Sequence, residues 1–312
     1  WIGNFDVGGQ GQTVGAIMSQ ANTIGIIGVG NMGGGMARRL LGLGWHVHVR
    51  DIDASKTEAL RTLGATVQDS PAALTAAVDR LIVCVIDSPQ VESVLFGEQG
   101  VKSALRQGQT VVMCPTLSPE DVESFGQRLQ SLGAHMIDAP MSGGPQRAAE
   151  GTMSLMVAAP APVYQANQDL LAALSGLVFN VSERVGDGAR TKLVNNLLAG
   201  INLVGAAQVL AMAQRMGLNL SKTLDVMERS SGQSWISSDR LRRALVNDYA
   251  PRAHVTLLEK DTRLAVAAGD AVGFTPELGR LAAAVFAQAH AAGLAEEDDA
   301  SVFKLYGQSS AS

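Results

Sequence analysis

The sequence has little of what marks several classes of protein. Aromatic residues make up 4% of its 312 residues, and only two cysteines occur, Cys84 and Cys114. The cysteines form no metal-ligand spacing, and a chain of this size does not need a disulfide, so we expect two reduced thiols and no metal site. There is no run of Lys and Arg, and the net charge is −5. The electrostatic basis for a nucleic-acid partner or an anionic membrane surface is therefore missing.

Long apolar runs and targeting signals are also absent. No apolar run reaches the roughly 18 residues needed to cross a bilayer, and the N-terminus lacks the basic and apolar regions of a signal peptide. These features predict a cytoplasmic protein without a membrane partner. With 46% hydrophobic and 17% charged residues, the chain is long enough for two globular domains. We expect residues 1–21, rich in Gly, Gln and Asn, to be a poorly ordered or tag-like extension.

A glycine-rich turn follows the first predicted strand, residues 23–29, whose apolar, β-branched run is typical of a strand buried on both faces. Gly28, Gly30 and Gly33 fit G-x-G-x-x-G. The first glycine allows a tight turn, the second a close approach to a pyrophosphate, and the third close packing of helix on strand. The pattern predicts a dinucleotide site at a helix N-terminus. The residues that would form this loop are Gly28, Val29, Gly30, Asn31, Met32 and Gly33.

A turn without a ligand is the alternative interpretation of these glycines. It leaves Gly34 and Gly35 unexplained, because glycine inside a helix costs about 1 kcal/mol relative to alanine. A second strand, residues 46–50, then leads to Asp51. A carboxylate there accepts hydrogen bonds from the adenosine ribose and repels a 2′-phosphate, which predicts NAD rather than NADP. Arg50 should point away from Asp51, unless the strand has already ended.

Short β-rich runs alternate with helical patterns as far as residue 185. This alternation predicts an α/β fold in which residues 22–185 form a Rossmann-type, doubly wound and mostly parallel sheet. Ser70-Pro71 and Ser118-Pro119 mark helix starts, because each places a capping residue before proline. Loops that follow the carboxyl ends of strands should border the dinucleotide. Further candidate strands are residues 80–85, 110–113, 134–138, 153–158 and 177–181.

From Gly186 onward the pattern is helical. We expect residues 186–312 to form an all-α domain that begins with a long helix reaching about Arg215. This helix is so apolar that it should be buried between the domains. Shorter helices are expected near residues 221–230, 235–246, 257–268 and 276–291.

Two local patterns indicate chemistry. Ser142, Gly143 and Gly144 lie between a predicted strand and a helix, where a hydroxyl and free N–H groups suit a carboxylate. A plain glycine-rich turn explains them equally well. Lys192 and Asn196 share one face of the long helix. Apolar neighbours disfavour the lysine's charge and move its pKa toward the range useful for acid/base catalysis. The alternative is a lysine whose amino group reaches water.

These segments occur in one order and spacing, and over about residues 22–307 the sequence resembles the β-hydroxyacid dehydrogenase family related to 3-hydroxyisobutyrate dehydrogenase. Shorter stretches, G-Q-S-W-I around Trp235 among them, are similar to the L-threonate dehydrogenase branch. The stretches that carry the family resemblance are I-G-V-G-N-M-G-G-G-M-A, D-A-P-M-S-G-G-P, G-D-G-A-R-T-K-L-V-N-N and E-K-D-T-R-L-A.

The resemblance implies a site between two domains. Lys192 would be the catalytic lysine with Asn196 beside it, and the substrate contacts would come from Ser142, Gly143, Gly144 and Trp235. Cofactor contacts beyond the glycine loop and Asp51 would come from Val85, Ile86, Gln90, Thr116 and Lys260. On local grounds Lys260 belongs to a solvated charged helix face, so its role rests on the resemblance. The sequence departs from the family pattern at Pro115, which has no N–H to donate, and at Ile86 and Met141.

The function implied is an NAD-dependent oxidation of a small hydroxy acid, or reduction of the oxo acid, by a homodimer or homotetramer. An L-threonate-like C4 acid is the expected substrate. Alternatives within the family are 3-hydroxyisobutyrate dehydrogenase and tartronate semialdehyde reductase. A non-catalytic dinucleotide sensor is the alternative from another class, because a Rossmann fold alone does not imply turnover.

Overall fold

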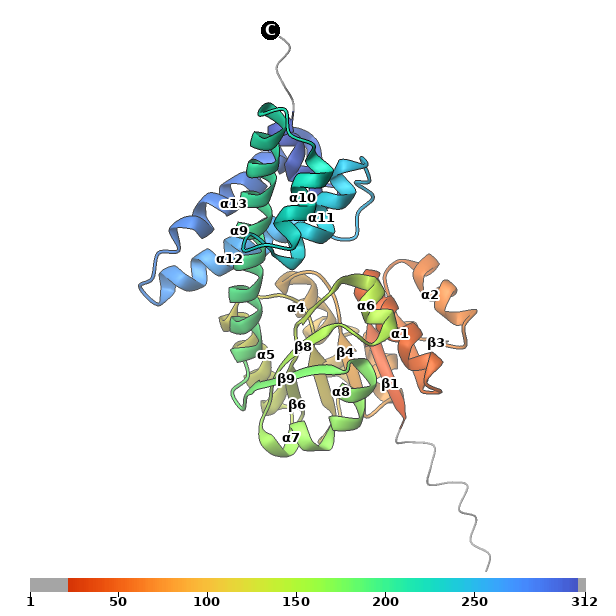
Figure 1. Cartoon of the computed structure of the whole chain (residues 1–312). Coiled ribbons are helices and arrows are strands. Elements are labelled where there is room, and N and C mark those ends of the chain that lie inside the picture. The colour runs from red at the N-terminus through yellow and green to blue at the C-terminus, as the bar shows by residue number, and fades with distance from the viewer. Residues whose placement is uncertain (1–21, 308–312) are drawn as a thin grey trace, which may run out of the picture.

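The computed structural model describes residues 22–307, so the expected extension at residues 1–21 lies outside the described part. Within that part a nine-stranded sheet organises the first half of the chain (Figure 1). Its order is β3-β2-β1-β4-β5-β6-β8-β7, with β9 paired to β8. The strands are β1 (Thr23–Ile27), β2 (His46–Arg50), β3 (Thr66–Val67), β4 (Arg80–Val83), β5 (Thr110–Met113), β6 (His135–Asp138), β7 (Met141–Ser142), β8 (Ser154–Ala158) and β9 (Leu177–Ser182).

The pairs from β3 through β6 are parallel, as is β8 with β9, whereas β8 runs antiparallel to β6 and β7. The predicted Rossmann-type sheet is confirmed. The two strands that the sequence did not indicate, β3 and β7, are two residues long. Such short strands cannot show the alternation on which a sequence-based prediction depends.

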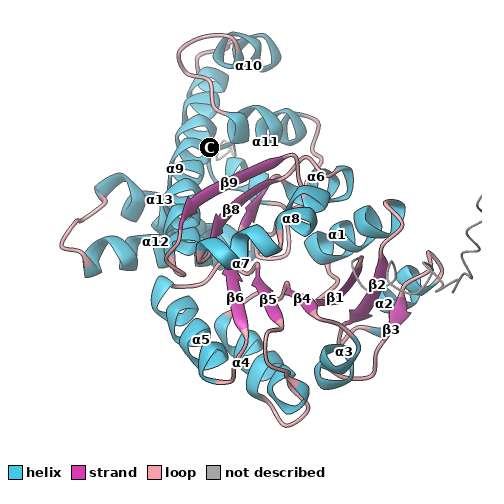
Figure 2. Cartoon of the chain, turned by 90° about the horizontal axis from the view of Figure 1, so that it is seen from below, coloured by secondary structure: helices cyan, strands magenta, loops and turns pink. Residues whose placement is uncertain are grey.

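Helices cover both faces of the sheet (Figure 2). On β4, Leu81 and Val83 face one layer and Ile82 the other, and all three are fully buried. The Ser70 and Ser118 hydroxyls accept backbone N–H bonds and cap two of these helices as predicted. One layer contains α1 (Asn31–Gly42), α6 (Gly144–Glu150), α7 (Ala161–Ala166) and α8 (Gln168–Leu174), the other α3 (Pro71–Ala77), α4 (Ser88–Phe96) and α5 (Pro119–Ser131), with α2 (Ala54–Arg61) at the β3 edge and a 3-10 turn, η1 (Val101–Ala104), after α4.

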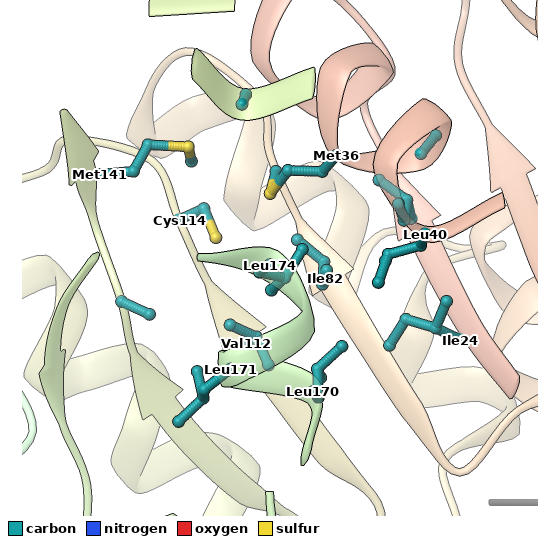
Figure 3. Close-up of a cluster of buried hydrophobic side chains, with 14 of the residues drawn as sticks. Ile24, Met36, Leu40, Ile82, Val112, Cys114, Met141, Leu170, Leu171 and Leu174 are labelled. Atoms are coloured by element: carbon teal, nitrogen blue, oxygen red, sulfur yellow. The ribbon is translucent and has the colours of Figure 1, made fainter. Parts of the chain in front are cut away.

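Figure 3 shows the core under α1 and α8. Ile24 and Val112 of the sheet meet Leu40 of α1 and Leu170 of α8. Each such side chain contributes about 1.5–3 kcal/mol when fully buried. This packing fixes α1, and with it the glycine turn, on the strand ends.

The second half of the chain is helical and lies to one side of the sheet, with α9 (Asp187–Arg215) running from the sheet into the helical group (Figure 1). Leu203 and Leu210 of α9 are packed with Phe286 and other apolar side chains of this group. The remaining elements are α10 (Leu220–Glu228), α11 (Trp235–Leu245), α12 (Val255–Ala271), α13 (Glu277–Ala289), a π-helical turn η2 (His290–Leu294), η3 (Asp299–Phe303) and α14 (Lys304–Gly307).

The expectation that α9 would be buried is only partly right. One side packs in the protein, but Val194 is 72% exposed and Leu198 58% exposed. Among residues 22–307, α9 is also the one helix long and apolar enough, by length and composition alone, to cross a membrane. The expected absence of such a stretch is therefore wrong by that measure. Half of the most apolar 18-residue stretch of α9 is buried inside the protein, so this is weak evidence for a membrane span.

Candidate active site

The three motif glycines have different surroundings at the carboxyl ends of β1 and β4. Gly28 has a φ of +88°, which favours glycine, and a Cβ there would lie 2.5 Å from the Cys84 carbonyl oxygen. A Cβ on Gly33 would lie 1.9 Å from the Gly28 carbonyl oxygen, so α1 packs against the turn. A Cβ on Gly30 would meet no atom within 4 Å. The open side at Gly30, at the start of α1, fits a pyrophosphate.

Gly35 has a separate structural role. A Cβ on Gly35 would lie 2.9 Å from both the Pro145 carbonyl oxygen and the Ala148 Cβ of α6. Gly35 therefore allows α1 to approach the helix that follows Ser142–Gly144. This packing links the glycine loop to the proposed carboxylate loop.

Asp51 lies beside the glycine loop. Its carboxylate accepts hydrogen bonds from the Val29 N–H at 2.7 Å and the Asp53 N–H at 2.9 Å. β2 ends at Arg50, so strand alternation does not separate the two side chains, and the Arg50 guanidinium donates to the Asp51 carbonyl oxygen. A negatively charged side chain, Asp51, and a positively charged one, Arg50, therefore both lie where the adenosine ribose is predicted.

The loop after β4 holds the predicted cofactor contacts Val85 and Ile86, and the third, Gln90, lies in the first turn of α4. The Gln90 side-chain oxygen accepts the Ile86 N–H at 3.0 Å, and the Gln90 N–H donates to Asp87. Ile86 is 55% exposed. These bonds fix the loop at the carboxyl end of β4, next to Gly28, as the sheet order requires.

A chain of hydrogen bonds crosses from the sheet to the helical group. The Lys260 ammonium donates to the Thr116 carbonyl oxygen at 2.6 Å and to the Asp261 carboxylate at 2.8 Å. The other Asp261 oxygen accepts from the Asn196 amide at 2.6 Å. The structure therefore brings Thr116, Lys260 and Asn196 together, although they lie far apart in sequence.

Lys192 is 6% exposed. Burial lowers its pKa from 10.5 to about 8, a shift that the Asp261 charge opposes and the Lys260 charge reinforces. Lys192 is therefore a buried amine that can exchange a proton near neutral pH, and Asp261 helps to set its pKa.

Asp261 was not among the predicted site residues. It is 7% exposed and joins Asn196 to Lys260, whereas its sequence context indicates a solvated face. The available signal was its place beside Lys260, and the contact with Asn196 could not be inferred from one sequence.

Ser142, Gly143 and Gly144 form the predicted turn between β7 and α6, with φ of +133° at Gly143 and +79° at Gly144. Ser142 pairs with Ser154 on β8. A Cβ on Gly188, at the start of α9, would lie 2.7 Å from the carbonyl oxygen of Met156, also on β8. One strand therefore supports both the loop and the start of the helix that bears Lys192.

Trp235 begins α11 and is 51% exposed. Two residues later, Ser237 donates to the Asn202 carbonyl oxygen of α9. The Trp235 ring lines a hollow with Ser238, Arg242 and Arg252. Its substrate contact therefore remains a prediction, placed more than a helical turn beyond Asn196.

Two family descriptions match the chain in succession. The NAD binding domain of 6-phosphogluconate dehydrogenase matches residues 23–183. The NAD-binding region of NADP-dependent 3-hydroxyisobutyrate dehydrogenase matches residues 186–306. An L-threonate dehydrogenase from Cupriavidus necator is 35% identical, and the alignment covers 92% of this chain and 96% of that protein. The chain belongs to the β-hydroxyacid dehydrogenase family related to 3-hydroxyisobutyrate dehydrogenase.

Solved structures agree with this family membership. A 3-hydroxyisobutyrate dehydrogenase from Salmonella typhimurium is 32% identical with a TM-score of 0.85, covering 91% of this chain and 99% of that one. A protein called Psf3, solved with NADP+ and 2-OPP, is 30% identical with a TM-score of 0.83, covering 90% of this chain and 99% of that one. This β-hydroxyacid dehydrogenase is thus an oxidoreductase that uses a nicotinamide dinucleotide.

Metal-ligating side chains do not gather anywhere in the described part of the chain. Across the described residues 22–307, no group of three or more His, Cys, Asp or Glu side chains is arranged to hold a metal ion. Cys84 and Cys114 are free thiols, and burial raises the pKa of Cys84 to about 12. Both thiols therefore stay protonated near neutral pH, whereas the pKa of Lys192 lies near 8.

Proposed function

We propose that the protein oxidises the alcohol of a small hydroxy acid, or reduces the matching oxo acid, with Lys192 as the general acid/base. The observation that carries this proposal is the buried Lys192 amine, whose pKa is lowered to about 8 and which is coupled to Asp261. A group with a pKa near the working pH serves as base and acid with similar efficiency. We further propose that it works in the cytoplasm, with residues 22–185 as the dinucleotide domain and 186–312 as the helical domain.

The bound dinucleotide supplies the hydride chemistry, and the protein positions the substrate and moves its proton. In oxidation, the neutral Lys192 amine accepts the proton of the substrate hydroxyl. In reduction, the Lys192 ammonium returns it to the oxygen of the oxo group. The proposed roles of Asn196 and the Ser142–Gly144 loop are to orient the substrate, with the loop's N–H groups and hydroxyl at the carboxylate.

An L-threonate-like C4 acid is the proposed substrate. Supporting this choice is the similarity to the Cupriavidus necator L-threonate dehydrogenase over nearly the whole chain. Polar Gln233 and Ser234 precede Trp235, but the Ser234 hydroxyl caps α11, so a further polar contact to substrate falls to Gln233. A site that binds extra hydroxyls should discriminate against acids that lack them.

The test is NADH formation over a panel of C3 and C4 hydroxy acids. We expect kcat/KM for L-threonate to exceed that for 3-hydroxyisobutyrate by about tenfold or more, since a lost polar contact costs over 1 kcal/mol. Equal turnover of the two would contradict the preference. Dinucleotide binding without turnover of any acid in the panel would favour the sensor alternative.

NAD+ is the proposed cofactor, because Asp51 would repel a 2′-phosphate. Two observations favour the opposite preference. The positively charged Arg50 lies beside Asp51, and the chain is similar to an NADP-dependent 3-hydroxyisobutyrate dehydrogenase and to a protein solved with NADP+. We expect kcat/KM to favour NAD+ over NADP+ and the Asp51→Ala variant to reduce that ratio by about tenfold, the effect of about 1.4 kcal/mol. Asp53→Ala, which removes the cap of α2 two residues later, should keep the ratio and is the control. A wild-type preference for NADP+ would show that Arg50 or another cation controls the pocket.

A homodimer or homotetramer is the proposed assembly. Val194 and Leu198 of α9 and Leu278 and Leu281 of α13 are each more than half exposed, and they flank the contact of Leu197 with Gly279. Apolar side chains gathered on two packed helices are typical of an interface.

Light scattering should give a dimer or tetramer for the wild type and a smaller species for Leu281→Glu, because a buried charge opposes association. Val246→Glu, at an exposed site after α11, should leave the mass unchanged. A monomeric wild type would refute the assembly.

A further inference from the structure

Asp138 is a buried acid at the end of β6 and is 1% exposed. One of its carboxylate oxygens, Oδ2, accepts the Gly186 N–H at 2.9 Å and the Ala189 N–H at 3.0 Å. These N–H groups belong to the start of α9, where the N-cap residue, Gly186, has no side chain to offer. The cap of α9 is therefore supplied from a strand in the sheet, 48 residues earlier in the chain.

The glycines at this helix start make room for the carboxylate. A Cβ on Gly188 would lie 2.9 Å from Asp138 Oδ2 and 2.7 Å from the Met156 carbonyl oxygen. Gly186 has a φ of +100°, which favours glycine. Gly186 and Gly188 therefore allow the N-terminus of α9 to pack closely against β6 and β8.

Asp138 also lies at the junction of the two proposed substrate contacts. Lys192 follows Ala189 by three residues, roughly 4.5 Å along the helix axis. In the other direction, the chain runs from Asp138 through Pro140 into Ser142–Gly144. A shift of α9 on the sheet would therefore move the Lys192 amine relative to the carboxylate loop.

We propose that Asp138 is a positioning residue, whose ionised carboxylate holds the start of α9 so that Lys192 faces the substrate oxygen. This inference rests on the proposed role of Lys192. A charged acceptor bonds backbone N–H groups more strongly than a neutral one and interacts favourably with the positive end of the helix dipole. Protonation of Asp138 loosens the helix end without removing any group that touches the substrate.

The surroundings of Asp138 support a titration in a usable range. Burial raises its pKa from 3.8 to about 6, opposed by the bonds from Ala189, Gly186 and Gly188 and reinforced by the charge of Asp187. Just after the neighbouring strand β5, Cys114 is buried and its pKa is raised well above the usual value, so it stays a thiol. Near this helix end Glu123 pairs with Arg190, Asp187 pairs with Arg184 and Arg190, and the Glu183 side chain is exposed.

The experiment is the pH profile of kcat for reduction of the oxo acid, measured with saturating NADH. Reduction needs Asp138 ionised and Lys192 protonated, so the wild-type profile should fall below about pH 6 and again above about pH 8. In Asp138→Asn the acid limb should disappear while the basic limb stays. A wild-type kcat that does not fall below about pH 6, measured while the enzyme is folded, overturns the inference.

The kcat and the NADH dissociation constant of the Asp138→Asn variant distinguish a positioning role of Asp138 from a purely structural one. At pH 7 we expect Asp138→Asn to lower kcat by about 10- to 100-fold, since a misplacement near 1 Å costs about 10²-fold, while the NADH dissociation constant changes less than about threefold. A folded variant with wild-type kcat overturns the inference, because a purely structural cap would leave kcat per folded, NADH-bound enzyme unchanged. Should that variant fail to fold, Gly188→Ala, which crowds the same carboxylate, must show the same loss of kcat.

Asp187→Asn is the matched control, because Asp187 lies on the same helix end but pairs only with surface arginines. It should keep kcat at pH 7 and an acid limb, which should move to lower pH because the Asp187 charge no longer raises the pKa of Asp138. Loss of both kcat and the limb in this variant would refute a specific role for Asp138. Failure of the proposed function gives a different result: Lys192→Ala would retain its turnover, whatever Asp138→Asn does.

Discussion

Replacing Lys192 with alanine is expected to lower kcat by about 10²- to 10⁴-fold, roughly 3 to 5.5 kcal/mol of barrier. The amine is buried, and its pKa is held near 8 by desolvation, so its removal deletes a proton-transfer group that the apolar surroundings cannot replace. The loss should fall on kcat, because the proton moves only in the transition state. Steady-state kinetics with a fluorescence titration of NADH measure both effects.

Lys222→Ala is the matched control for this variant. Lys222 lies in the first turn of α10 with an exposed side chain, so its truncation should leave kcat unchanged. If Lys192→Ala loses affinity for the hydroxy acid but keeps kcat, Lys192 only holds the carboxylate. Near-normal kinetics of a folded Lys192→Ala variant would eliminate the acid/base role.

Replacing Asp261 with asparagine is expected to lower kcat/KM by about 10²-fold and to shift the pH profile. The Asp261 carboxylate accepts hydrogen bonds from both Lys260 and Asn196. Asparagine at this position removes the negative charge and leaves the Lys260 ammonium without its buried partner, at a cost of about 3 kcal/mol. The Asp261 charge raises the pKa of Lys192, so its removal lets that pKa fall. The basic limb of the reduction profile should therefore move from about 8 to lower pH.

Glu259→Gln tests whether this effect is specific. Glu259 precedes Lys260 on α12 and pairs with His290 at the surface, so its neutralisation changes the charge of the same helix without touching the cluster. This variant should keep the wild-type rate and the basic limb. A basic limb that moves to higher pH in Asp261→Asn would contradict the assigned coupling.

Most of the sheet could be predicted because its central strands, β1, β4, β5, β6 and β8, are buried almost throughout and leave continuous apolar runs. The loop after β1 could also be predicted, since Gly28 and Gly33 are required by close backbone contacts that no other residue allows. Helix bounds followed from caps such as Ser118. These features depend on neighbours in sequence or on the β-α-β order.

Contacts between distant segments could not be predicted in this way. Asp261 reaches Asn196 and Asp138 caps α9, but each pair is separated by dozens of residues, and one sequence does not record which helix face meets which strand. The long helix was expected to be buried because it is apolar, yet Val194 and Leu198 are exposed. Apolar composition alone does not distinguish a helix buried all round from one with an exposed apolar face.

In the proposed mechanism one buried amine, that of Lys192, serves both directions of the reaction. This role is tested most directly by the pH dependence of kcat/KM for oxidation and reduction with the same enzyme. With increasing pH the kcat/KM for oxidation should rise and that for reduction should fall through a shared pKa near 8, because oxidation needs the neutral Lys192 amine and reduction its ammonium. Both limbs should be absent in Lys192→Ala. Profiles without a shared limb, or limbs that persist in Lys192→Ala, would contradict this role.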